Sequence, residues 1–231
     1  MFDISPAEWT AILLSLRVAV VATLVATPFG IALAWLLARR DFWGKSILDA
    51  AVHLPLVLPP VVTGYLLLLT FGRRGLVGAW LADHLGIVFA FRWTGAALAC
   101  GIMSFPLLVR PIRLSIEAID RRLEQASSTL GAAPWQVFAT VTLPLALPGV
   151  LAGMVLGFAK AIGEFGATIT FVSNIPGETQ TISSAIYSLI QTPDGDAAAG
   201  RLVLISIVIA MSALIASEWF ARRATKRLHG N

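Results

Sequence analysis

Two charged side chains stand inside a long apolar stretch of the sequence. Lys160 and Glu164 are four residues apart, so in a helix both lie on one face and can form an ion pair. Charges in apolar surroundings are costly, and they usually pair with each other or face an aqueous path. We expect either a structural ion pair or the lining of a route, along which Lys160 offers a positive charge to an anion.

Two hydroxyl side chains lie beside breaks in other apolar stretches. Thr63 follows Pro55, Pro59 and Pro60, and Ser104 lies two residues before a further proline. Proline removes a backbone donor, so a helix must bend there and leave carbonyl groups that need other partners. Broken helices often mark substrate routes, although a kink required for packing gives the same pattern. Thr63 and Ser104 are therefore candidate hydrogen-bond donors to an anion.

Signatures of catalysis and of metal binding are missing from the sequence. It contains no Gly-x-x-x-x-Gly-Lys-Ser/Thr phosphate loop. The single cysteine, Cys100, can form no disulfide within the chain and is expected to pack as a small apolar side chain. The three histidines, His53, His84 and His229, are too scattered to suggest a metal cage. We expect no enzyme, no metal site and no cofactor on this chain.

The elements that must position these residues are membrane-spanning helices. Hydrophobic residues make up 57% of the 231 residues, charged residues make up 13%, and the mean hydropathy is +0.82. Soluble domains carry roughly 45–50% apolar and about 25% charged residues. A transmembrane helix needs about 20 mainly apolar residues. We predict a single all-α, polytopic membrane domain, residues 1–231, with about five transmembrane helices. The predicted spans are 18–38, 50–72, 93–109, 143–158 and 202–217.

Positive charges orient the predicted spans. With an odd number of spans, placing the N-terminus outside puts eleven basic residues in cytoplasmic segments and four in outer ones. The basic residues cluster between apolar runs, so membrane orientation explains the net charge of +4 better than nucleic-acid binding does. Arg17 is expected to reach the headgroups at the outer end of the first span, and Trp219 to anchor the last span at an interface. The short stretch 181–190 is expected to form an interfacial or re-entrant helix.

The longest segment between predicted spans covers residues 110–143. Residues 115–130 have helix-forming composition, and Gly131 is expected to end that helix. Pro134 is expected to begin a second short helix that ends before Leu143. The resulting elbow would present apolar side chains to a partner's groove, or it would be an ordinary interfacial hairpin. The apolar side chains are Trp135, Val137 and Phe138.

A glycine repeat marks the fourth predicted span. Gly149, Gly153 and Gly157 recur every four residues and leave one face nearly free of side chains. Small residues at this spacing let helix backbones approach closely. We predict tight packing within the subunit, and the alternative is a place at a dimer interface or along the pathway.

The elbow also carries a spaced pattern. It resembles the EAA loop of bacterial ABC importer permeases, which reads Glu-Ala-Ala, three residues, Gly, nine residues, Ile, any residue, Leu-Pro. In that family the loop forms coupling helices that sit in a cleft of the ATPase, so the resemblance implies this role for about 115–144 here. The spacing matches fully, with three changes of residue type, and Glu124 lies one position before the motif acid. The matching residues are Gln125, Ala126, Ser127, Gly131, Val141, Leu143 and Pro144.

Two further stretches resemble the molybdate permeases. These are HLPLVLPPVVTGY at 53–65 and, at 163–179, GEFGAT followed by NIPGET. Sulfate and tungstate permeases share parts of these signatures. The resemblance implies the ABC importer permease (MetI-like) fold and a homodimer in the cell inner membrane. The distribution of basic residues predicts a periplasmic N-terminus and a cytoplasmic C-terminus. It further implies a ModC-like ATPase, which would hold ATP and Mg, and a periplasmic ModA-like molybdate-binding protein.

The resemblance thus predicts a permease subunit that translocates molybdate, with a sulfate or tungstate permease as the alternative. Two other classes compete with it. A passive channel would work without an ATPase. A membrane enzyme would need clustered polar side chains within the spans, and only Lys160 with Glu164 approaches such a cluster.

Overall fold

The computed structural model describes residues 4–229, with side chains as far as Ala216. All regular secondary structure in this part of the chain is helical, which confirms the predicted all-α class. The order is α1 Pro6–Arg39, α2 Lys45–Val57, α3 Pro60–Phe71, α4 Leu76–Leu85, α5 Trp93–Glu117, α6 Arg121–Thr129, α7 Pro134–Val137, the π-helix η1 Phe138–Thr142, α8 Leu143–Ile162, α9 Gly166–Val172, α10 Ile182–Leu189 and α11 Asp196–His229.

Helix α1 runs the length of the bundle. It starts twelve residues before the predicted span 18–38, because the Ser5 hydroxyl and the Glu8 carboxylate cap each other's backbone N–H groups and Pro6 occupies the first turn. At about 1.5 Å per residue, its 34 residues extend about 51 Å. This exceeds the roughly 30 Å of a bilayer core, so α1 projects beyond it. Pro28 lies within the helix without ending it.

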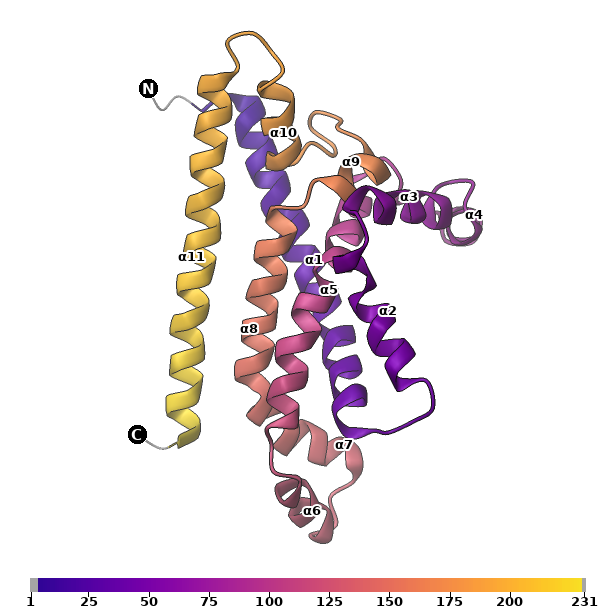
Figure 1. Cartoon of the computed structure of the whole chain (residues 1–231), viewed down its shortest axis with the longest axis vertical. Helices are drawn as coiled ribbons and strands as arrows, with labels where there is room; N and C mark the ends of the chain where they lie inside the picture. Colours follow the sequence, from indigo (N-terminus) through magenta and orange to yellow (C-terminus); the bar gives the residue numbers. More distant parts are fainter. Residues whose placement is uncertain (1–3, 230–231) are drawn as a thin grey trace.

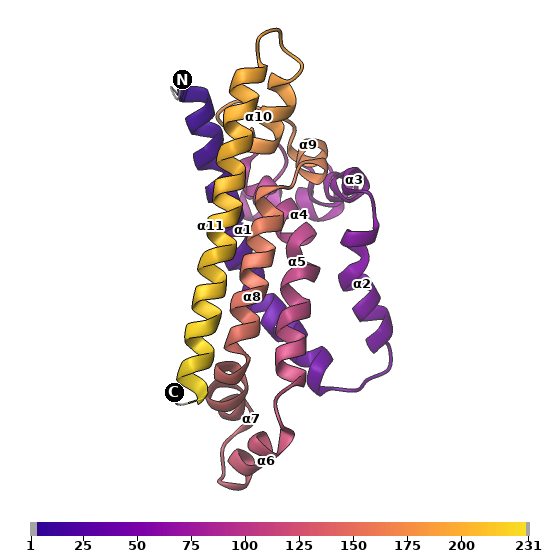
Figure 2. The same ribbon diagram turned by 60° about the vertical axis from the view of Figure 1, so that its left-hand side comes forward.

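Helices α1, α5 and α8 form the centre of the bundle, and α11 lies alongside α8 (Figures 1 and 2). The glycine repeat of α8 faces α5. A Cβ atom at Gly149 would overlap the Ser115 side chain, and one at Gly153 would lie 2.5 Å from the Leu108 carbonyl oxygen. The two backbones therefore meet at these glycines.

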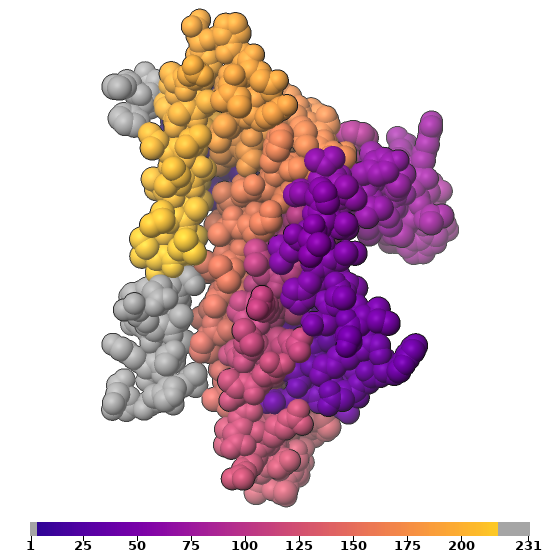
Figure 3. All heavy atoms as spheres, in the orientation of Figure 1, coloured from indigo at the N-terminus to yellow at the C-terminus, as the bar shows by residue number. Residues whose placement is uncertain are grey.

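The predicted span 50–72 is not one continuous helix. Helices α2 and α3 are bent by 114° relative to each other. Leu58 is extended because Pro59 follows it, and Pro60 starts α3 at its first position. Helices α3 and α4 turn sideways and form an arm at the side of the bundle (Figures 1 and 3). Within the described residues, four helices are long and apolar enough to cross a membrane, or five if this bent pair counts as one span.

The segment between α5 and α8 differs from the prediction in two places. Helix α5 continues to Glu117, and the predicted helix 115–130 is wrong: the chain breaks before α6, whose first turn the Asp120 side chain caps through the Arg122 N–H at 2.9 Å. The second helix does not end before Leu143. It continues through η1 into α8, where the Leu143 N–H bonds to the Phe138 carbonyl, a wider turn placed directly before Pro144, which has no N–H.

The predicted corner of the elbow is present. Gly131 has a φ of +87° after the end of α6, and Pro134 occupies the first turn of α7. The short stretch 181–190 forms helix α10, and its interfacial or re-entrant placement stays a prediction. Helix α11 extends beyond the predicted span at both ends, while the side chain of the expected anchor Trp219 lies outside the described residues. The N-terminus of α1 and the C-terminus of α11 lie at opposite ends of the bundle (Figure 1).

Candidate coupling elbow and buried polar site

The elbow, residues 121–142, projects from the end of the bundle where α1 ends (Figures 1 and 2). Gln125 and Ala126 on α6 are exposed, and Ser127 beside them is half-buried. Gly131 lies at the exposed corner between α6 and α7. Val141 and Leu143 are half-buried, and Pro144 is exposed in the first turn of α8. The motif residues thus follow the elbow from α6 to the first turn of α8.

The apolar side chains of the elbow divide between two faces. Trp135 is 70% exposed, as a docking residue must be, but Val137 is 7% exposed and the Phe138 ring packs edge-on against Trp35 of α1 with centroids 6.1 Å apart. The prediction that Val137 and Phe138 face a partner is wrong, because the turn after Pro134 directs them toward the bundle. Leu130, 89% exposed at the corner, joins Trp135 on the outer face instead.

A network beneath the elbow was not predicted from the sequence. The Glu124 carboxylate lies 3.1 Å from Nε of Arg39 and accepts a hydrogen bond of 2.7 Å from the Thr142 hydroxyl. Arg39 is 85 residues away in the chain, so no local pattern could reveal this contact. The one available signal was an acid at 124 where the motif expects its acid at 125.

Lys160 and Glu164 form an ion pair, with Nζ and Oε2 2.6 Å apart. They do not share a helix, since α8 ends at Ile162 and Glu164 lies in the short link to α9. The Glu164 side chain is 1% exposed and also accepts a hydrogen bond of 3.0 Å from the Ala167 N–H in the first turn of α9. The Lys160 side chain is 29% exposed. The pair therefore joins α8 to α9 and leaves part of the Lys160 side chain accessible.

The two predicted hydroxyl donors occupy different surroundings. Thr63 is buried in α3, and its hydroxyl has no hydrogen-bond partner among the side chains and backbone that the structure describes. The neighbouring Gly64 lies against α9, where a Cβ atom would be 2.5 Å from the Ala167 carbonyl oxygen. Helix α3 thus packs against α9 at Gly64, next to Thr63. Ser104 is fully buried between α5 and α8 and donates to the Gly101 carbonyl at 3.2 Å, so its role on a route stays a prediction.

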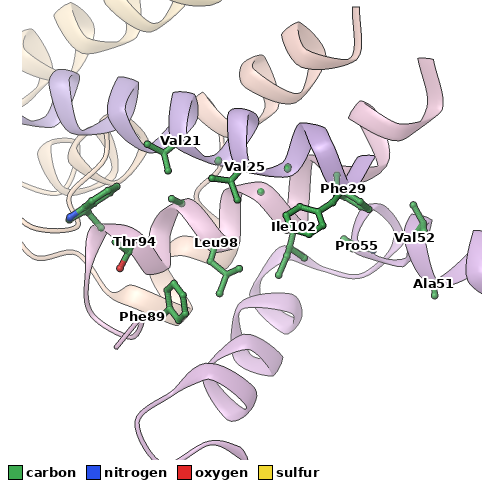
Figure 4. Close-up of a pocket in the computed structure, with 16 residues that line it drawn as sticks. Val21, Val25, Phe29, Ala51, Val52, Pro55, Phe89, Thr94, Leu98 and Ile102 are labelled. Atoms are coloured by element: carbon green, nitrogen blue, oxygen red, sulfur yellow. The ribbon is translucent and has the colours of Figure 1, made fainter. Parts of the chain in front are cut away.

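A cavity of about 650 Å³ lies between α1, α2 and α5. Figure 4 shows Val21, Val25, Phe29, Leu98 and Ile102 around it. Its lining is almost entirely apolar, and an anion placed there would lose its hydration without gaining donors. This cavity is therefore not the site for an oxyanion.

Two further charged contacts lie in the N-terminal half of α1, away from the elbow. Glu8, 5% exposed, forms an ion pair of 3.0 Å with Arg201 of α11. The Arg17 guanidinium lies 3.7 Å from the centre of the Trp93 ring, so this exposed side chain has an aromatic partner on α5. Neither contact was predicted, because both partners lie far apart in the sequence.

Comparison with known proteins gives consistent relatives. Residues 26–226 match the family described as binding-protein-dependent transport system inner membrane component. The molybdenum transport system permease protein ModB of Escherichia coli (strain K12) is 61% identical over 220 residues, which cover 95% of this chain and 96% of that protein.

Solved structures share the fold. A chain of a bacterial ABC transporter involved in the import of the acidic polysaccharide alginate has a TM-score of 0.74 at 20% identity. The match covers 95% of this chain and 80% of the transporter chain. A chain of the MetNI methionine ABC transporter has a TM-score of 0.71 at 14% identity. The match covers 97% of this chain and 99% of the transporter chain.

Apolar helices that can cross a bilayer, the matched family model and the shared fold together define a multi-pass membrane transport subunit with the fold of ABC importer permeases. The identity along nearly the whole chain makes the assignment narrower. The chain belongs to the family of inner membrane components of binding-protein-dependent transport systems.

Proposed function

We propose that this chain is the permease subunit of an ATP-driven ABC importer that carries molybdate across the inner membrane. The observation that carries the proposal is the 61% identity to a molybdenum transport permease over 95% of the chain. The stretches at 53–65 and 163–179 support it, because the first supplies the break that shapes α2 and α3 and the second supplies Glu164 and α9.

The proposed role of the elbow is coupling to a ModC-like ATPase. Gln125, Ala126, Leu130 and Trp135 are exposed on its outer face, which suits insertion of a short helix into a groove. The sequence has no phosphate loop, so ATP and Mg would bind to the partner and not to this chain. Because the ATPase partner would be cytoplasmic, the proposed orientation places the elbow and the C-terminus in the cytoplasm and the N-terminus in the periplasm.

The proposed pathway lies between two copies of the chain. Thr63 and the pair Lys160 and Glu164 are the polar groups that would border it, with the Lys160 side chain, 29% exposed, nearest to a passing dianion. A periplasmic ModA-like protein would deliver the ion and supply most of the selectivity, since a tight pocket within the route would trap the ion. Sulfate and tungstate remain the alternative cargoes, because they are dianions of the same tetrahedral shape.

The test is uptake of labelled molybdate and labelled sulfate, in parallel, by cells that lack this chain and by the same cells complemented with it. We expect molybdate uptake alone to be lost and recovered at submicromolar supply. Loss of sulfate uptake instead would overturn the cargo while leaving the fold. Uptake that survives deletion of the ATPase would overturn the importer in favour of a passive channel.

A further inference from the structure

The acid of the elbow faces the bundle and not the partner. The Glu124 side chain is 17% exposed and its partner Arg39 is 8% exposed, whereas the neighbouring Gln125 is exposed on the outer face of α6. The family pattern has a single glutamate at the position of Gln125, whereas here the acidic side chain and the exposed side chain belong to two neighbouring residues. Gln125 is available to a partner, and Glu124 is committed to contacts within the chain.

The network around Glu124 joins four segments. Its carboxylate accepts hydrogen bonds from Nε of Arg39, in the last turn of α1, and from the Thr142 hydroxyl, in η1. A second nitrogen of the same guanidinium donates to the Ile119 carbonyl at 3.2 Å, in the turn between α5 and α6. The Glu124 carboxylate and the Arg39 guanidinium each form a second hydrogen bond besides the one that joins them, so both charged groups are held in place.

The second limb of the elbow is attached to α1 as well. Trp35, one turn before Arg39, packs edge-on against Phe138 of η1, and the Arg40 guanidinium lies 5.8 Å from the centre of the Trp35 ring. The last turn of α1 therefore holds α6 through an ion pair and η1 through an aromatic contact. A displacement of the elbow relative to α1 would have to break both.

The far end of α1 is attached to the opposite end of the molecule. The Ser15 hydroxyl accepts a hydrogen bond of 2.7 Å from the Ile182 N–H at the start of α10, and Glu8 pairs with Arg201 of α11. Helix α1 is a single uninterrupted helix between these two sets of contacts. It is the one described element that bonds by side chains to both the elbow and α10.

We propose that Glu124 is a positioning residue for coupling: with Arg39 and Thr142 it fixes the elbow to α1, so that a movement of α6 is transmitted along α1 to the opposite end of the bundle. This inference rests on the proposed importer function. It differs from a docking role, because the carboxylate acts through Arg39 and touches neither ATP nor the cargo.

The test uses the reconstituted complex of this chain with its ATPase and molybdate-loaded binding protein in proteoliposomes. Glu124→Gln weakens the link to Arg39, and the double variant Arg39→Met with Glu124→Gln cuts the link without leaving a buried unpaired charge. The matched control is Glu117→Gln, which removes a 38% exposed carboxylate that pairs with Arg113 at the same end of the bundle. Uptake and ATP hydrolysis are measured on equal amounts of assembled complex.

We expect both Glu124 variants to hydrolyse ATP while uptake per ATP falls at least about fivefold, with Glu117→Gln unchanged. A merely structural role predicts that all activities fall in parallel, or that the double variant recovers coupling together with stability, and either result would overturn the proposal. Unchanged uptake per ATP in the double variant would overturn it too.

A distance measurement separates this inference from the proposed function. Spin labels at Trp43→Cys, just after α1, and Arg122→Cys, on α6, report on the link directly, since both native side chains are exposed and the native Cys100 is buried. We expect Glu124→Gln to broaden this distance distribution whatever the cargo is. An unchanged distribution contradicts the link, whereas a wild-type complex that fails to import molybdate contradicts the function alone.

Discussion

At the scale of single residues, the corner of the elbow depends on one backbone angle. Gly131 has a φ of +87°, and a Cβ atom added there would meet nothing within 4 Å. A residue other than glycine at this position therefore meets no steric clash with its neighbours. It is destabilised only because its backbone must adopt a left-handed conformation, at a cost of roughly 1–2 kcal/mol.

We expect Gly131→Leu to distort the corner and to uncouple uptake from ATP hydrolysis without preventing membrane insertion. Gly131→Asn is the matched control, since asparagine adopts this conformation more readily. The measurement is molybdate uptake and ATPase activity at equal membrane levels of the chain. Wild-type uptake by Gly131→Leu at normal expression would disprove the importance of the corner.

The ion pair of Lys160 and Glu164 also yields a prediction at this scale. Lys160→Met leaves a carboxylate that is 1% exposed without its cation, which destabilises the chain by about 3 kcal/mol. In the double variant Lys160→Met with Glu164→Gln, the side chains are neutral and the Ala167 N–H keeps an oxygen acceptor.

We expect the double variant to recover thermal stability in detergent. Its uptake then separates the two roles left open by the sequence. Recovered uptake identifies a structural pair, whereas a stable variant without uptake shows that the ammonium group serves the anion. The comparison requires uptake to be normalised to folded protein.

At the scale of elements, the contact between α5 and α8 sets how closely the central helices approach. Gly153→Ala places a methyl group 2.5 Å from the Leu108 carbonyl oxygen, so one backbone must move. Gly157→Ala places it 3.6 Å from the Leu108 side chain, which is ordinary contact. Overpacking of this kind costs typically about 1–3 kcal/mol.

We expect Gly153→Ala to lower the melting temperature of the purified chain by several degrees and Gly157→Ala to leave it nearly unchanged. Equal effects of the two substitutions would show that this part of α8 packs less closely than the structure indicates. Circular dichroism at 222 nm during heating in detergent follows the loss of helix.

The elements themselves were largely predictable from local sequence signals. Apolar runs of about 20 residues located the long helices, and Gly131 and Pro134 located the corner. The sideways course of α3 was not predictable, because Pro59 and Pro60 indicate that the helix bends but not in which direction. The inward direction of Val137 and Phe138 was missed because it depends on a distant partner: the Phe138 ring packs against Trp35 of α1, about one hundred positions away.

At the scale of the whole molecule, the contacts that join distant elements had no signature in the sequence. Arg39 with Glu124, Glu8 with Arg201, and Arg17 with Trp93 each join residues more than 70 positions apart. Each residue type taken alone fits a snorkelling or exposed charge. The candidate site was therefore predictable as a set of motif residues, while the manner in which the bundle holds it was not.

The charge balance of the buried pair has an electrical consequence. Lys160 and Glu164 together carry no net charge, so the pair as a whole does not neutralise a dianion. An inner membrane that is negative inside opposes anion entry by about 2.3 kcal/mol per charge at 100 mV, or about 4.6 kcal/mol for two charges. For the proposed cargo, the membrane potential pushes outward, and inward transport requires work from ATP at every ion carried.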